Sequence, residues 1–333
     1  MAILLLPLVA AILLFVEAPP KYPAKRAPNA LQTTLYQRLS DGGLSGDELA
    51  TVGALTLGYK QDLDKELRRH FQASGAAHVL AVSGLHTGIL YGIVLWVLTL
   101  GGRVRPMHEN KLGRWALSSV IIVLMWGYAW LTGMTPSVVR AVLMVTLVEI
   151  GRMMYRNSLS INTVASAAVL ILLAHPKDLW SVSFQLSFAA TFSIVWFMSS
   201  VRFDYIHTRI PKVLSYVLGI IVVSLAAQLG TMPITMYHFG QFSTYFLLTN
   251  LIVLPLATLL VPCGLISIGL GGSVAGVWFS KITWFFAWLM NHAVGWIEAL
   301  PGSCIQASAT PLMVAVYYVF LLGFGFALRS LKR

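Results

Sequence analysis

The chain has 333 residues, of which 57% are hydrophobic and only 11% are charged, and its formal net charge is +11. Soluble domains carry about 25% charged residues, so these values and a mean hydropathy of +0.77 exclude an ordinary soluble protein. The excess of Lys and Arg is typical of the cytoplasmic loops of membrane proteins, although a basic surface also attracts polyanions. The composition predicts an all-α, polytopic membrane protein.

The N-terminal part of the chain divides into an apolar and a polar segment. Residues 1–16 form one apolar run without a basic n-region or a clear cleavage site, so we expect a retained transmembrane span. If the chain begins inside a longer gene product, this run is the tail of an earlier helix. Residues 17–77 are the longest polar stretch, and we expect them to be an extracytoplasmic segment.

This polar segment opens with a proline-rich linker and then shows two helical patterns. Residues 45–58 begin with a capping serine and acidic first-turn residues, which are typical of a helix start. Residues 61–73 place Leu63, Leu67 and Phe71 on one face of a helix. The spacing predicts an amphipathic helix that lies at the membrane interface or against the bundle.

Apolar segments long enough to form membrane helices follow one another from residue 78 onward. Together with the first run they predict about nine to ten spans. The expected segments are 78–100, 115–131, 136–150, 161–174, 182–201, 213–230, 245–270, 278–300 and 312–328.

The loops between these spans alternate in charge. Loops 101–114, 151–157 and 202–212 and the C-terminal tail are basic, whereas the intervening loops 132–135, 231–242 and 301–311 carry no Lys or Arg. Because cytoplasmic loops are the basic ones in membrane proteins, this pattern predicts a cytoplasmic C-terminus.

Several prolines predict interrupted helices. Thr135 and Pro136 are expected to cap and open a helix after a sharp turn. Pro233 is expected to end a helix, and Pro255 and Pro262 to break the following apolar run. Irregular backbone at membrane depth is tolerated where it lines a cavity, so the pattern predicts a bundle with broken or re-entrant helices of the kind found in transport pathways.

Ser83 and His86 place a hydroxyl and an imidazole three residues apart on one helix face. Three interpretations remain open. The pair could be the nucleophile and base of an intramembrane serine hydrolase, although no third group can be named. It could be polar lining of a pathway, or it could be a structural hydrogen-bonded pair.

Four further polar residues lie within the expected spans. Arg140 is a membrane-embedded cation, which either extends to the outer interface or guards the mouth of an anion-conducting path. Gln185, Gln228 and Asn250 add neutral hydrogen-bonding groups at the same outer level. Each of these could instead join helices.

Motifs for other chemistry are missing from the sequence. It contains no Walker-type phosphate loop, no HExxH and no dense His/Asp cluster, and Cys263 and Cys304 have neither a metal-binding spacing nor the placement of a disulfide. We therefore expect no metal, no cofactor and no nucleotide hydrolysis.

Four stretches of the sequence together resemble the ComEC-type competence DNA channels, in matching order from about residue 55 to near the C-terminus. They are HVLAVSGLHTGIL (78–90), TGMTPSVVRAVLM (132–144), HPKDLWSVSFQLSFAATFSI (175–194) and AQLGTMPITMYHFGQFSTYFLLTNLIVLPL (227–256). The resemblance implies that residues 78–333 form a multi-pass channel domain of the bacterial inner membrane, which passes single-stranded DNA into the cytoplasm during natural transformation.

The chain departs from the family pattern in two respects. Members commonly carry an extracytoplasmic OB-like domain, and many carry a metallo-β-lactamase-like domain. Residues 17–77 are too short for the OB fold, and no HxHxDH motif is present. We expect an excised channel domain or a shortened member, without nuclease activity.

The resulting expectation is a hydrophilic conduit whose outer part is lined or gated by Ser83, His86, Arg140, Gln185, Gln228 and Asn250. Its expected partners are single-stranded DNA, membrane lipids, an extracytoplasmic DNA receptor or nuclease, and a cytoplasmic ATPase or strand-binding protein. Two alternatives remain. One is a small-solute or proton-coupled transporter with His86 and Glu149 as titrating groups, and the other is the serine hydrolase using Ser83 and His86.

Overall fold

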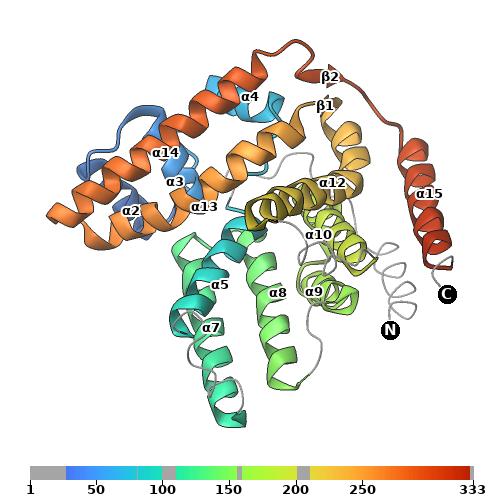
Figure 1. The fold of residues 1–333 in the computed structure, drawn as a ribbon, viewed down its shortest axis with the longest axis horizontal. Coiled ribbons are helices and arrows are strands. Elements are labelled where there is room, and N and C mark those ends of the chain that lie inside the picture. The colour runs from blue at the N-terminus through green and yellow to red at the C-terminus, as the bar shows by residue number, and fades with distance from the viewer. Residues whose placement is uncertain (1–27, 81, 100–109, 156–159, 201–210, 331–333) are drawn as a thin grey trace.

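The computed structural model describes residues 28–80, 82–99, 110–155, 160–200 and 211–330 (Figure 1). The expected first span, residues 1–16, lies outside this part. The helices are α2 (Ala30–Asp41), α3 (Gly46–Thr56), α4 (Lys65–Ala73), α5 (Gly84–Leu98), α7 (Lys111–Leu131), α8 (Pro136–Met153), α9 (Ile161–Ala174), the 3-10 helix η1 (Pro176–Trp180), α10 (Val182–Ser200), α12 (Lys212–Phe239), α13 (Phe246–Leu270), α14 (Val274–Glu298) and α15 (Pro311–Ser330).

Within the described ranges, each span predicted from residue 78 onward overlaps one helix between α5 and α15. Three of these helices, α7, α12 and α13, are both long and apolar enough to cross a membrane, and α5, α9, α10 and α15 contain shorter apolar stretches. The prediction of an all-α membrane bundle is therefore confirmed. A short antiparallel pair of strands, β1 (Gln241–Ser243) and β2 (Cys304–Gln306), joins the segments before α13 and α15.

Pro136 opens α8 as predicted, but the helix breaks expected at the other three prolines are wrong. Pro233 lies inside α12, and Pro255 and Pro262 lie inside α13. A proline lacks the N–H that would bond the carbonyl four residues earlier, which for Pro233 is the carbonyl of Leu229. Tyr317 on α15 donates its hydroxyl to this oxygen at 3.0 Å. A neighbouring helix therefore supplies the missing donor, and α12 continues.

The first apolar core joins the N-terminal helices to the long α13–α14 pair. All residues of α3 from 49 to 56 are buried, and Thr51 Oγ1 donates to Asn291 Oδ1 at 2.9 Å. Gly264 on α13 allows this close approach, because a Cβ there would lie 2.8 Å from Cγ2 of Thr56. Helix α4 packs against α14. Of the two positions predicted for an amphipathic helix in this segment, the structure therefore supports the one against the bundle. Helix α2 was not predicted.

The second core lies between α5, α7 and α8. Ile121, Met125, Val138 and Val142 are fully buried there. Helices α9, α10 and α12 continue the bundle on the far side of α8, and α15 lies at the edge of the molecule, where it contacts α12 (Figure 1). Helix α8 is thus placed between two groups of helices, and the polar residues that it carries face both of them.

Candidate functional site

Ser83 and His86 form a local hydrogen-bonded pair at the start of α5. Ser83 is the N-cap residue, and both its backbone N–H and its Oγ contact Nδ1 of His86, at 3.1 Å and 3.0 Å. The prediction that α5 begins near His78 is wrong, because the helix starts at Gly84. The capping pair fixes this start by satisfying a backbone donor that the helix leaves unpaired.

The other ring nitrogen of His86 is unsatisfied. The side chain is fully buried, and its Nε2 has no hydrogen-bond partner among the residues that the structure describes. Since Nδ1 accepts the N–H of Ser83, the neutral ring carries its proton on Nε2. His86 therefore offers a buried N–H donor that none of the described residues uses.

Two groups that can carry a positive charge lie near this pair. Lys60 and His78 lie close enough to His86 for their charges to act on its ring. Both are exposed to solvent, yet surrounding protein lowers the pKa of His78, and the same enclosure, with the charge of Arg68, lowers the pKa of Lys60.

Arg140 lies one turn into α8 and is almost completely buried, with 3% of its surface exposed. Its Nη2 donates to the carbonyl and the hydroxyl of Ser183 on α10, at 3.0 Å and 2.6 Å, while its Nε has no partner in the described part of the chain. The side chain is therefore enclosed between α8 and α10.

The three predicted amide side chains lie in different surroundings. Gln185 donates to the Leu179 carbonyl at 3.1 Å and contacts Nε2 of His238 at 3.0 Å. Asn250 donates to Ser224 on α12 at 3.1 Å, and its buried Oδ1 has no partner among the described residues. Gln228 is half-buried on α12.

The structure brings some of the six predicted residues near one another and leaves others apart. Ser137 on α8 donates to the carbonyl of Val82, at 2.6 Å, and so ties the start of α8 to the start of α5. Arg140 reaches α10, where Gln185 lies two residues beyond its partner Ser183. The starts of α5, α8 and α10 thus form one polar layer, whereas Asn250 pairs separately between α12 and α13.

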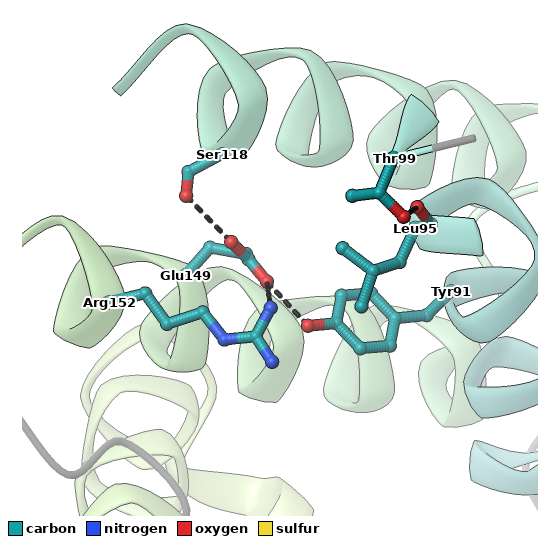
Figure 2. Close-up of polar contacts among 6 residues, drawn as sticks. All are labelled: Tyr91, Leu95, Thr99, Ser118, Glu149 and Arg152. Carbon is teal, nitrogen blue, oxygen red and sulfur yellow. Dashed lines mark hydrogen bonds and ion pairs between the residues drawn. The ribbon is translucent and has the colours of Figure 1, made fainter. Parts of the chain in front are cut away.

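Sequence reasoning missed a polar cluster further along α5 and α8 (Figure 2). Glu149 is 1% exposed. Its carboxylate accepts from Tyr91 at 2.5 Å, from Ser118 at 2.7 Å and from Arg152 at 3.1 Å. An acid three residues before an arginine on an otherwise apolar helix was the available signal, but Tyr91 and Ser118 come from other helices.

Two arginines that were predicted to lie in loops belong to helices. Arg114 is in the first turn of α7 and is 8% exposed, and Arg152 is in the last turn of α8. The apolar runs began after Arg114 and ended before Arg152. Hydropathy alone therefore placed the start of α7 too late and the end of α8 too early. Within the described residues, no group of three or more His, Cys, Asp or Glu side chains could hold a metal ion.

Apolar helices that enclose hydrogen-bonded polar and charged side chains define a polytopic membrane protein with polar interiors between its helices. The family model described as Competence protein matches residues 55–332. The chain therefore belongs to the competence protein family, and its predicted ComEC-type resemblance is confirmed.

Individual relatives agree with this assignment. ComE operon protein 3 of Bacillus subtilis is 30% identical over 277 residues, which are 82% of this chain and 32% of that protein. Recombination protein 2 of Haemophilus influenzae is 26% identical over 232 residues, 66% of this chain and 28% of that protein. An uncharacterized Escherichia coli protein is 27% identical over 262 residues, 75% of this chain and 34% of its own length. The chain thus spans about a third of these relatives. No solved structure matches it.

Proposed function

We propose that the chain is a membrane-embedded component of DNA uptake in natural competence, and that its bundle conducts one DNA strand into the cytoplasm. The proposal places the protein in the bacterial inner membrane, with its C-terminus in the cytoplasm and with no catalytic step of its own. Its family supports the role in competence. The observation that carries the conduit is the arrangement of buried polar groups along α5 and α8.

These groups lie at two levels of the same helix pair. Ser83, His86 and Arg140 belong to the starts of α5 and α8, and Glu149 contacts Tyr91, more than one turn further along α5. Polar side chains buried between membrane helices are expensive and usually serve a pathway or a partner. His86 and Arg140 each retain a buried N–H donor without a protein partner among the described residues, and such donors suit the weak, repeated phosphate contacts of a moving strand.

The helices α5, α7 and α8 also share a buried apolar core, and we propose that this core closes the path. Opening requires the helices to part at Ile121, Met125 and Val142. Each phosphate also moves inward against an inside-negative potential at about 2.3 kcal/mol per 100 mV. We therefore propose that a cytoplasmic ATPase or a strand-binding protein draws the DNA inward, and that an extracytoplasmic receptor or nuclease delivers it.

Transformation frequency tests the proposal when it is measured together with membrane abundance. Arg140→Ala and His86→Ala should lower transformation strongly at normal abundance, because each removes a buried donor from the proposed path. The exposed Arg38 on α2 provides the matched control, and Arg38→Ala should transform normally. Normal transformation by both path variants would return these residues to a purely structural role.

The hydrolase alternative has one favourable observation, the 3.0 Å contact between Ser83 Oγ and His86 Nδ1. However, the same nitrogen also accepts the backbone N–H of Ser83, and Nε2 has no acidic partner among the described residues. A triad base is oriented by such a third group. Covalent labelling of Ser83 by a serine-reactive probe would favour the hydrolase. The transporter alternative gains no support, since the contacts of His86 and Glu149 share no residue.

A further inference from the structure

A cavity of about 450 Å³ lies between α5, α7 and α8, on the side of the Glu149 cluster. Its polar lining consists of Thr99, Arg114, Ser118, Glu149 and Arg152. The volume falls within the range of about 300–1,000 Å³ that is typical of small-ligand sites. The cavity is distinct from the polar layer formed by Ser83, His86 and Arg140.

Arg114 is the unusual residue of this cavity. It is only 8% exposed, and neither its Nε nor its Nη2 has a hydrogen-bond partner in the described part of the chain. One face of its guanidinium is covered by the ring of Tyr155, 3.2 Å from the ring centroid. Stacking of this kind leaves the N–H edge of the group free. A covered face and unpaired, buried N–H groups leave Arg114 with donors that an anion in the plane of its fork could satisfy.

The charges around the cavity are unbalanced. Two guanidinium groups, those of Arg114 and Arg152, face the single carboxylate of Glu149. That carboxylate already accepts from Tyr91, Ser118 and Arg152, and among the described residues it makes its ion pair with Arg152, not with Arg114. The described lining residues thus leave one positive charge without a counter-charge, and a buried, unpaired cation is strongly unfavourable.

We propose that this cavity binds a phosphate group. Arg114 contributes its unpaired N–H groups, because a planar fork of N–H donors matches the oxygens of a phosphate. Arg152 provides the second positive charge. Because Arg152 also pairs with Glu149, the carboxylate and the ligand compete for it. The phosphate can belong to the DNA strand or to an anionic lipid headgroup, since both present a phosphodiester with one negative charge. The inference does not depend on the proposed function, because a lipid would serve the site equally well.

Binding to the purified full chain in detergent tests this proposal in two arms. The first measures the anisotropy of a short fluorescein-labelled oligothymidylate, and the second measures retention of phosphatidylglycerol by native mass spectrometry. Arg114→Gln should weaken binding about tenfold in one arm. The arm that responds identifies the source of the phosphate. Lys212→Gln, which removes a basic charge at the start of α12 away from the cavity lining, should change neither arm.

Glu149→Gln provides a test that does not rely on loss of binding. It removes the carboxylate that competes for Arg152, while its amide retains an oxygen for one of the two hydroxyl donors and an N–H₂ group that the other hydroxyl can accept from. Binding in the responding arm should therefore become tighter. The proposal is overturned if Arg114→Gln folds and leaves binding in both arms unchanged. If Arg114→Gln fails to fold, the proposal is overturned when Glu149→Gln binds no more tightly than the unmodified chain. A response in the lipid arm alone supports the site and assigns it to lipid.

Discussion

Gly230→Ala tests how closely α10 and α12 are packed. Gly230 is buried on α12, and a Cβ at this position would lie 2.5 Å from the carbonyl oxygen of Ala189 and 2.7 Å from the Cβ of Ser193, both on α10. Neither contact involves the far end of a flexible side chain. The added methyl group therefore forces the two helices apart, and a small residue is required at this crossing.

The expected change in the free energy of unfolding follows from three contributions, of which two are destabilising and one is stabilising. Overpacking of this kind destabilises by about 1–3 kcal/mol. Separating the helices also weakens the hydrogen bond from Ser193 Oγ to the Ala226 carbonyl, 2.6 Å long, which contributes about 1 kcal/mol. Alanine restores at most about 1 kcal/mol of helix propensity relative to glycine. The net effect is a loss of about 1–3 kcal/mol.

The same helix offers a matched control. Gly219 on α12 has no neighbour within 4 Å of the position that an added Cβ would take, so Gly219→Ala adds the same helix propensity without the steric conflict. Unfolding of both variants in mixed micelles, followed by circular dichroism, should show that only Gly230→Ala is destabilised. Equal stability of the two variants would refute the close packing of α10 on α12.

Two further predictions concern individual hydrogen bonds. Tyr317→Phe should lower stability by about 1 kcal/mol in the native chain but have little effect in a Pro233→Ala background, where residue 233 regains an N–H for the Leu229 carbonyl. A double-mutant cycle measures this coupling, and additive effects would contradict it. Gln32→Ala should loosen α2 by about 1–2 kcal/mol, because buried Gln32 donates to the Leu57 carbonyl at 2.8 Å. Faster proteolysis within α2 is the expected result, and an unchanged rate would argue against this contact.

The helices could be predicted from the sequence because a membrane span depends on a continuous apolar run. The continuity of these helices through prolines could not be predicted, because it depends on residues that lie far away in the sequence. Pro233 predicts a break, but α12 continues, and Tyr317 bonds the Leu229 carbonyl that the proline leaves free, across a separation of 88 positions in the sequence. The burial of α3 similarly depends on Gly264 and Asn291 of the C-terminal half.

The candidate site divides in the same way. The Ser83–His86 pair was found because its two residues lie three positions apart on one helix, so the contact is local. The Glu149 cluster was missed because Tyr91 lies 58 positions away and Ser118 lies 31 positions away. Arg114 was assigned to a loop, since a charge at the edge of an apolar run cannot be placed inside or outside a helix by hydropathy alone.

Photo-crosslinking during uptake tests the proposed DNA path most directly. A benzophenone amino acid at Gln185, which lies half-buried in the polar layer, should crosslink to labelled single-stranded DNA in cells that are taking it up. The same group at Trp96, which lies on α5 and is 66% exposed, should not. Crosslinking at Gln185 alone is the expected result. Equal crosslinking at both positions, or none at Gln185 while transformation proceeds, would contradict a path through this bundle.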